Sequence, residues 1–279
     1  MVPVFDYRLP GPALREHVRL FQIVGCTFPA ALAVLPAKAY WPRAENCLSF
    51  FPRDPEQVEY GFNGQRLASP PVRLYGQHTV ATNRHVGRDF MVFQIVFQPG
   101  ALFQLTGLSA AELTNTFLDA EQVFPPEIKW VSERLRNVAH YLDMIPLVEE
   151  FLLRLIRHTR PGFRSVDKVS RYLLHHPAHV SLDWLADQAC LSQRQFYRQF
   201  VERQGISPKL FARVARFEQA MRRKNALPLQ DWLTVALDLG YYDYQHLVRD
   251  FRQFTGLTPN AFWQRDSLSP ERAFGMAET

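Results

Sequence analysis

The sequence lacks the features that define several large classes of protein. Its 279 residues include only three cysteines, Cys26, Cys47 and Cys190. They are far apart and odd in number, which predicts buried free thiols rather than a disulfide or zinc framework. The longest apolar stretch, 30–37, is interrupted by Pro36 and is far shorter than the ~20 residues of a membrane-spanning helix. Glycine-rich phosphate loops and a nucleophile elbow are also absent, so the sequence offers no catalytic residue by motif.

The start of the chain has no apolar signal segment, because residues 1–8 include Asp6 and Arg8. We therefore expect a cytoplasmic protein with no membrane partner. Hydrophobic residues make up 47% of the chain, enough for two cores, and the net charge is +5 with a pI of about 9.2. Residues 1–160 hold 16 basic and 15 acidic side chains, whereas residues 161–279 hold 16 and 12. The positive surplus lies mainly in the C-terminal part, where it permits an anionic partner.

The two halves of the chain differ in pattern, which predicts an α+β protein of two domains, 1–160 and 161–279. Short runs rich in aromatic residues and valine predict strands at 20–24, 47–51, 72–75 and 90–97, forming a sheet or barrel. Beyond Gly100, Ser109 and Glu112 are spaced as a helix capping box, and helices are expected at 127–142 and 146–158, the second with Pro146 at its first position. Residues 159–162, Thr-Arg-Pro-Gly, are the expected linker.

The C-terminal part contains an internal repeat. An offset of 51 residues pairs Arg198 with Arg249 and Phe200 with Phe251, and it pairs the segment 205–208 with 256–259. Upstream of these blocks the offset becomes 50, so one repeat has an extra residue near the turn. The repeat predicts two copies of one structural unit.

Each unit is predicted to be a helix-turn-helix. In the first, Leu182, Leu185, Ala186 and Ala189 form an apolar stripe, and Ser192 caps the second helix with Gln195 three residues later. Phe196, Phe200 and Val201 are expected to face inward. In the second unit Gly240 supplies the turn and Asp243 the cap, with Trp232, Val235, Leu247 and Phe251 inward and Tyr244, Gln245, Val248 and Arg249 outward.

A helix-turn-helix places its second helix in the DNA major groove, where arginine recognises guanine and glutamine recognises adenine. A long helix at 211–224 would separate the DNA-contacting helices of the two units by about one turn of DNA, roughly 34 Å. Its basic side chains contact phosphates or form a solvated face, and the pattern does not decide between the two. These side chains are Arg213, Arg216, Arg222, Arg223 and Lys224.

Residues 165–265 resemble the DNA-binding domain of the AraC/XylS family of bacterial transcription regulators. The segments that carry the resemblance are 181–186 (SLDWLA), 191–192 (LS), 196–200 (FYRQF), 205–208 (GISP), 236–241 (ALDLGY), 246–251 (HLVRDF) and 256–259 (GLTP). Cys190 departs from the usual turn glycine, and Tyr242 stands where a small residue is common. The repeat and the resemblance give these candidate DNA-binding residues: Gln193, Arg194, Tyr197, Arg198, Tyr244, Gln245, His246 and Arg249.

The N-terminal part resembles the cupin-like sensor domains of the same family, through Gly76-Gln77, the expected strand 90–97, and Pro99-Gly100-Ala101. The resemblance implies a β-barrel that binds a small effector, followed by helices that often mediate dimerisation. Polar and aromatic residues in or beside the expected strands are candidate effector ligands, with strand-edge residues that bind nothing as the alternative. They are Tyr40, Trp41, Arg43, Asn46, Gln77, His78 and Gln94. His78 and His85 alone do not make a metal site, and we expect no metal and no cofactor.

We therefore predict a sequence-specific transcription regulator rather than an enzyme. Its partners would be double-stranded promoter DNA, a small-molecule effector, RNA polymerase and a second copy in a homodimer, and the resemblance favours activation. One alternative is a cupin-type small-molecule-binding protein or enzyme whose helical tail is an interaction module. Another is a regulator whose first domain only dimerises. The helices at 127–142 and 146–158 either form the dimer interface or cover the sheet.

Overall fold

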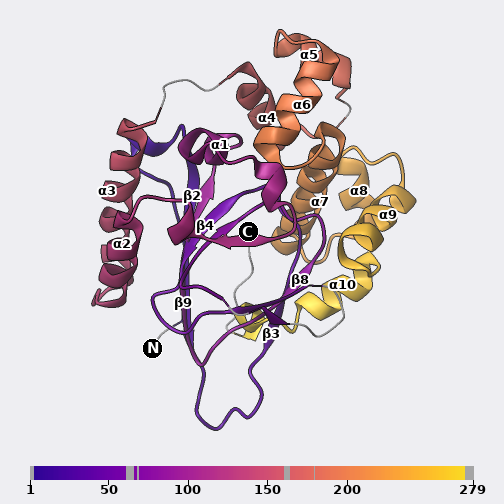
Figure 1. Ribbon diagram of the computed structural model, residues 1–279. Helices are drawn as coiled ribbons and strands as arrows, with labels where there is room; N and C mark the ends of the chain where they lie inside the picture. Colours follow the sequence, from indigo (N-terminus) through magenta and orange to yellow (C-terminus); the bar gives the residue numbers. More distant parts are fainter. Residues whose placement is uncertain (1–2, 61–65, 68, 160–163, 179, 274–279) are drawn as a thin grey trace.

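The computed structural model describes residues 3–60, 66–67, 69–159, 164–178 and 180–273 (Figure 1). It confirms the α+β class: a β-rich N-terminal part is followed by a helical C-terminal part. We call residues 3–159 the barrel domain and residues 164–273 the helical domain, within the described ranges. The expected linker and the expected boundary at 160/161 lie outside the described residues, except for Thr159.

Two antiparallel sheets form the barrel domain, one with the order β1-β2-β9-β4-β7-β10 and one with the order β3-β8-β5-β6. All four predicted strands are present. The strands are β1 (Val4–Arg8), β2 (Val18–Thr27), β3 (Ala37–Tyr40), β4 (Cys47–Phe50), β5 (Gln57–Tyr60), β6 (Arg66–Leu67), β7 (Val72–Tyr75), β8 (Thr82–His85), β9 (Asp89–Phe97) and β10 (Phe117–Asp119).

The larger sheet has two different faces because side chains alternate along each strand. In β2 and β9, Phe21 pairs with Ile95 and Ile23 with Phe93, and all four pack into a core with the neighbouring helices. The alternating residues Gln22, Val24, Val92 and Gln94 belong to the opposite face and line a cavity inside the barrel. The sequence pattern of the two strands therefore positions both a core and a pocket.

The helices after the sheet differ in detail from those predicted. They are α1 (Ala101–Thr106), α2 (Glu127–Arg136) and α3 (Met144–Arg157), with short 3-10 turns η1 (Pro12–Leu14), η2 (Ala110–Leu113), η3 (Ala120–Gln122) and η4 (Tyr141–Asp143). The predicted capping box was wrong: Ser109 precedes a 3-10 turn, and its hydroxyl donates to the carbonyl of Glu202 instead.

The single helix expected at 127–142 was also wrong. It ends at Arg136, and His140 begins a new turn by accepting a hydrogen bond from the backbone N–H of Leu142. The next helix starts at Met144, so Pro146 is its third residue, still within the first turn, where backbone N–H groups have no helical partner. Val148, Phe151 and Leu152 of α3 are buried in the core of the large sheet. The two helices α2 and α3 thus cover this sheet.

The helical domain contains the two predicted helix-turn-helix units, joined by a long helix. Its helices are α4 (Ser165–His175), α5 (Leu182–Gln188), α6 (Gln193–Gln204), α7 (Pro208–Ala226), α8 (Trp232–Asp238), α9 (Tyr244–Thr255), α10 (Pro259–Asp266) and α11 (Pro270–Ala273). Figure 1 shows these helices against the barrel on the side opposite α2 and α3. No helix in the described part of the chain is long and apolar enough to cross a membrane.

The hydrophobic core of the helical domain includes side chains of the barrel domain. Trp41 and Ala44 of the barrel domain are buried among side chains of α4, α7 and α10, and the Trp41 ring meets the edge of Phe262 at a centroid distance of 6.4 Å. Burial of large aromatic side chains is a strong source of stability. The domains are therefore docked in this conformation.

Candidate DNA-binding surface and effector pocket

The turns before both recognition helices have the same backbone geometry. Cys190 has φ 53° and Gly240 has φ 70°, which places both in the left-handed region. Ser192 and Gln195 form the predicted capping box of α6, and Asp243 accepts a hydrogen bond from the His246 N–H at the start of α9. The cysteine at position 190 thus adopts the conformation for which glycine is better suited. Its thiol is exposed, contrary to the prediction of a buried one.

Most of the candidate DNA-binding side chains are accessible. Gln193, Arg194, Tyr197 and Arg198 of α6 are exposed. In α9, Gln245 and Arg249 are exposed, while Tyr244 and His246 are half-buried.

Three details of the predicted helix faces were wrong. Val248 was expected to face outward but is 7% exposed, because it lies four residues after Tyr244 and three before Phe251, on the packed stripe of α9. Val201 was expected to face inward but is only half-buried. Leu182 was placed in the apolar stripe of the first unit, but it is 38% exposed, one turn before the buried Leu185.

A hollow of about 1860 Å³ separates the two recognition helices and is partly open to solvent. Tyr197 of α6 lines it from one side, and His246 and Arg249 of α9 line it from the other. Its floor is the start of α7, with Lys209 and Arg213. Candidate residues from both units therefore lie around a single basic concavity.

Within the hollow, Asp250 holds α7 and α9 together. Its carboxylate accepts hydrogen bonds from Arg213 at 2.6 Å and from the Tyr241 hydroxyl at 3.2 Å. Burial and the Asp250 charge raise the pKa of Tyr241. The ring of Tyr241 also lies under Arg216, at 4.0 Å from the guanidinium carbon. These contacts fix the second recognition helix on the connecting helix.

Arg222, Arg223 and Lys224 of α7 bond to other groups of the protein, an outcome that neither sequence alternative, a phosphate-binding face or a solvated face, included. Arg222 bonds to Glu218 at 2.9 Å, and Arg223 bonds to Asp238. Lys224 donates to the carbonyl oxygens of Pro228 and Gln230. We therefore assign these three side chains to packing.

A narrow pocket inside the barrel lies between the two sheets, with a volume of about 590 Å³ when the solvent-open space at its mouth is included. A smaller hollow of about 270 Å³ adjoins it and shares Tyr40, Arg84 and Gln94 with it. The Tyr40 ring contacts two cations, with the guanidinium carbons of Arg84 and Arg43 at 3.6 Å and 4.5 Å from its centroid. Such cation–π contacts position all three side chains.

Five of the seven candidate effector residues meet at these hollows: Tyr40, Trp41, Arg43, His78 and Gln94. Gln77 does not line either hollow. Its amide donates to the carbonyls of Arg43 and His78, at 2.6 Å and 2.7 Å, and so supports the wall from behind. Asn46 is buried outside both hollows.

A buried ionic cluster, missed by the sequence interpretation, forms the polar end of the pocket. Glu56 accepts from Arg84 at 3.0 Å and from the Tyr75 hydroxyl at 2.9 Å, and Arg73 lies 3.6 Å away. Burial, followed by the charge of Glu56, raises the pKa of Tyr75. Among the described residues, Arg84 Nε and the side-chain oxygen of Gln22 have no hydrogen-bond partner. Both residues line the pocket, and these two atoms are buried in its wall.

His78 is held as a neutral side chain beside this cluster. Burial, reinforced by Arg84, lowers its pKa to about 4. Its ring is 3.2 Å from the Tyr60 hydroxyl and 3.0 Å from the Gly76 carbonyl, while His85 is 2.8 Å from Glu59. The described residues contain no group of three potential metal ligands.

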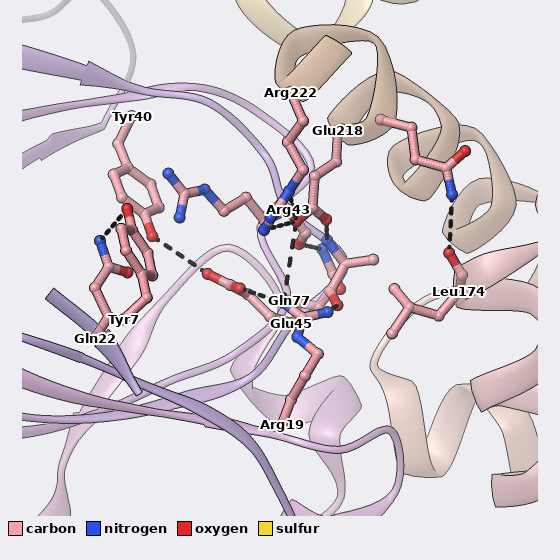
Figure 2. A network of polar contacts seen from close by, with 12 residues as sticks. Tyr7, Arg19, Gln22, Tyr40, Arg43, Glu45, Gln77, Leu174, Glu218 and Arg222 are labelled. Atoms are coloured by element: carbon pink, nitrogen blue, oxygen red, sulfur yellow. Dashed lines mark hydrogen bonds and ion pairs between the residues drawn. The ribbon is translucent and has the colours of Figure 1, made fainter. Parts of the chain in front are cut away.

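A polar network leads from the pocket wall to α7, as Figure 2 shows. The Tyr40 hydroxyl donates to Glu45 at 3.2 Å, and Arg19 bonds to Glu45 at 2.7 Å. Arg19 also lies 4.0 Å from Glu218, which accepts the backbone N–H of Ala44 at 2.9 Å. The chain of contacts joins the pocket to the connecting helix between the two units.

The barrel domain also contacts the C-terminal end of each recognition helix. The hydroxyl of Thr114 donates to the Gly205 carbonyl at 2.7 Å, after α6, and the Ala81 N–H donates to the Phe254 carbonyl at 2.7 Å, in α9. Gly205 has φ 90°, and an added Cβ there would lie 2.8 Å from the Ala110 carbonyl. The N-terminal halves of both helices, which carry the candidate DNA-binding residues, remain on the outside.

Two family models match the chain. Residues 185–265 match a helix-turn-helix domain, and residues 8–119 match a domain of unknown function (DUF6597). The C-terminal domain is an AraC-type helix-turn-helix domain. With this AraC-type domain the chain is a DNA-binding transcription regulator. A search of curated proteins finds no match.

Three solved structures are similar to parts or most of the chain. A point variant of ToxT from Vibrio cholerae, solved in its apo form, is 8% identical, with a TM-score of 0.50 over 88% of this chain and 97% of ToxT. Wild-type ToxT with an unsaturated fatty acid bound is also 8% identical, with a TM-score of 0.50 over 93% and 98% of the two chains. The DNA-binding domain of AdpA in complex with target DNA is 24% identical over 38% of this chain and 95% of that chain, with a TM-score of 0.35. At these identities the likeness to ToxT shows the fold alone.

Proposed function

We propose that this regulator reads two successive major grooves of promoter DNA with α6 and α9. The observation that carries the proposal is the shared basic hollow, because Tyr197, His246 and Arg249 reach it from two separate recognition helices. Arg194 and Arg198 extend the exposed face of α6, and Gln193, Tyr244 and Gln245 complete the set. The exposed N-terminal halves supply the hydrogen-bonding groups that distinguish base pairs in the major groove.

The connecting helix sets the geometry of this reading. Asp250 fixes α9 to Arg213 on α7, and Ser207 caps the start of α7 directly after α6. Lys209 lies in the first turn of α7, on the floor of the hollow, where a helix N-terminus and a cation together favour a phosphate. We assign Lys209 to the DNA backbone between the two grooves.

We further propose that residues 1–160 form a sensor domain whose barrel pocket holds a small effector. The pocket combines apolar walls with a few converging polar groups, as ligand sites generally do. ToxT, which shares the fold, has been solved with an unsaturated fatty acid bound. Activation through contact with RNA polymerase is the direction that the family resemblance implies, and homodimerisation belongs to the same proposal.

The DNA-binding proposal is tested by incubating the purified chain with sheared DNA of its host and sequencing what is retained. We expect a shared motif that spans two adjacent helical turns. Arg198→Ala and Arg249→Ala should each reduce affinity for this motif about 10-fold to 100-fold, since a bidentate contact to a base is worth about 1–3 kcal/mol. Arg154→Ala is the matched control, because Arg154 is an exposed arginine of α3 that is bonded to Glu150.

Retention of a motif only one half as long would contradict the two-groove reading. Affinity for the full motif should also fall with salt, by roughly 0.9 log units per phosphate contact for each tenfold rise in concentration. Lys209→Ala should lower this slope by about one contact while leaving the motif unchanged. An equal loss of affinity in the Arg154→Ala control would mean that the losses in the two recognition helices report general instability.

The sensor proposal is tested by thermal shift of the full chain against a panel of small metabolites, because a ligand of the folded state raises the melting temperature. A compound that raises it in the wild type but not in Arg84→Met would locate binding at the barrel pocket. A stabilising compound whose effect is unchanged by this substitution would place the effector elsewhere.

A further inference from the structure

The short helix α11 brings an acidic side chain into the barrel pocket. Glu271 lines the cavity together with Lys38 of β3, and its carboxylate lies 2.6 Å from the Lys38 ammonium group. The two side chains are only 4% and 15% exposed. An ion pair so far from solvent needs both partners, because either charge alone is costly to bury. The helical domain therefore supplies one wall of the effector pocket.

The position of Glu271 follows from the helical domain. The neighbouring Arg272 donates to Asn225 of α7 at 2.6 Å and to Asp266 of α10 at 2.7 Å. Its guanidinium carbon also lies 5.0 Å from the ring centroid of Trp263. Since these contacts all belong to the helical domain, Glu271 connects that domain directly to the interior of the barrel.

The charges around the cavity favour a carboxylate at this position. The ionisable groups of its lining are Lys38, Arg84, Glu56 and Glu271, apart from Tyr40 and Cys26. Glu56 is balanced by Arg84 and by Arg73 behind it. If Glu271 were withdrawn, the groups that remain would carry a positive excess, which another anion could neutralise.

The rest of the lining indicates the body of such a ligand. Phe5, Val24, Val86, Phe90 and Val92 form apolar walls next to the Lys38–Glu271 pair. Arg84, Gln22 and Gln94 add polar side chains to the same lining. The site therefore suits a small carboxylic acid with an apolar or aromatic body.

We propose that Glu271 is an internal carboxylate that occupies the place of such an acid, and that the two compete for Lys38. The proposal rests on the sensor role proposed above and names its ligand class. Binding of the acid displaces α11 from the barrel, and this weakens one of the contacts that hold the domains together. An effector can shift the docking of the domains only through such a difference in affinity between the two arrangements.

The test uses the full chain and two pairs of probes, 3-phenylpropanoate with 3-phenylpropanamide and octanoate with octanamide, titrated by calorimetry. We expect at least one of the two acids to bind Glu271→Gln about 10-fold more tightly than the wild type, because the competing charge is gone. The neutral amides should bind both proteins alike. Lys38→Met should abolish the preference for the acid over its amide. Glu202→Gln is the control, since Glu202 is an exposed glutamate of α6 outside the pocket lining.

Two further measurements test where the acid binds and whether α11 leaves the barrel. Cys26 lines the pocket, so in a Cys190→Ser background the acid should protect it from 4,4′-dithiodipyridine, whereas the amide should not at the same concentration. Hydrogen exchange at the backbone N–H groups of Glu271 and Arg272 should become faster when the acid binds. Slower or unchanged exchange would show that the acid binds beside Glu271 and not in its place, which overturns the proposal.

Equal affinity of both acids for the wild type and Glu271→Gln, or no binding of either to Glu271→Gln, would also overturn it. These results are independent of DNA binding. A chain that selects its DNA motif but binds neither acid loses the carboxylate proposal alone. A chain that binds the acids as expected but selects no DNA keeps the pocket assignment and loses the proposed two-groove reading.

Discussion

Replacing Glu218 with alanine should separate the two domains without unfolding either. Glu218 is buried at the interface, where it accepts the Ala44 N–H from the barrel domain and lies close to Arg19 and Arg222. The alanine variant leaves the Ala44 N–H without its acceptor, which costs about 1–3 kcal/mol when the group stays buried. It also removes a second, more distant carboxylate from Arg19, at 4.0 Å, while Glu45 stays bonded to that side chain at 2.7 Å.

The expected total is about 2 kcal/mol, the middle of that range. The ion pair with Arg222 adds little to docking, because both residues belong to α7 and Arg222 is 38% exposed. A loss of about 2 kcal/mol reduces the docking equilibrium about 30-fold. Glu218→Gln retains an acceptor for the Ala44 N–H, so it should lose about half as much free energy as the alanine variant.

Small-angle scattering and hydrogen exchange measure this effect directly. We expect a larger radius of gyration for Glu218→Ala and faster exchange around Ala44, with the recognition helices still protected. Glu150→Ala is the matched control, since Glu150 forms the same (i, i+4) pair with an arginine but is exposed, and such pairs contribute under about 0.5 kcal/mol. A scattering profile for Glu218→Ala that matches the control would refute the assignment of Glu218 to domain docking.

The same carboxylate predicts a pH dependence. Burial on its own would raise the pKa of Glu218, but Arg19, Arg222 and Arg43 outweigh it and hold the pKa below its usual 4.5. A carboxylate with a lowered folded pKa stabilises the docked state above its ordinary pKa and loses this contribution as the pH falls through the folded value. Docking should therefore be constant at neutral pH and weaken only in acid below about pH 4.5. Glu218→Gln should lack this transition.

Two other predictions concern single residues in each domain. Cys190→Gly should raise the free energy of unfolding of the helical domain by about 1 kcal/mol in urea, because the left-handed backbone is strained for any residue with a Cβ. Gly240→Ala should lower it for the same reason. A destabilised Cys190→Gly or a stabilised Gly240→Ala would contradict this account of the turn. The barrel domain should lose up to about 3 kcal/mol as the pH falls from 6.5 to 4, because unfolded His78 takes up a proton that burial denies to the folded state. His78→Gln should remove this dependence. Urea unfolding at pH 7 and pH 5 measures it, and a loss of stability in acid that persists in His78→Gln would contradict the assignment to His78.

Local patterns predicted much of the fold. The repeat, with the caps at Ser192 and Asp243, located both recognition helices, and β-branched and aromatic runs located the strands. The pattern failed where a competing contact decided the outcome. Ser109 resembles a cap but bonds to Glu202, which is 93 residues away. His140 similarly ends an otherwise apolar helical pattern by starting a new turn.

The pocket was only partly predictable for the same reason. Tyr40, His78 and Gln94 stand out as polar or aromatic residues in strands, and the structure places them at adjoining hollows. Arg84 has the same kind of signal within β8 and was overlooked. Glu271 carries no local signal, because its role depends on the position of α11 against a strand more than 200 residues earlier. The periodicity of apolar residues in a sequence does not indicate which contacts form between domains.

The connecting helix α7 limits how this regulator can be re-engineered. Arg213 on one of its turns holds the second recognition helix through Asp250, and Glu218, little more than a turn later, holds the barrel domain. A hybrid in which the barrel of another regulator replaces this one would keep its operator preference but lose the Arg19 and Ala44 contacts to Glu218. Joining a new sensor domain to this DNA-binding domain therefore requires transferring the interface residues together with the pocket.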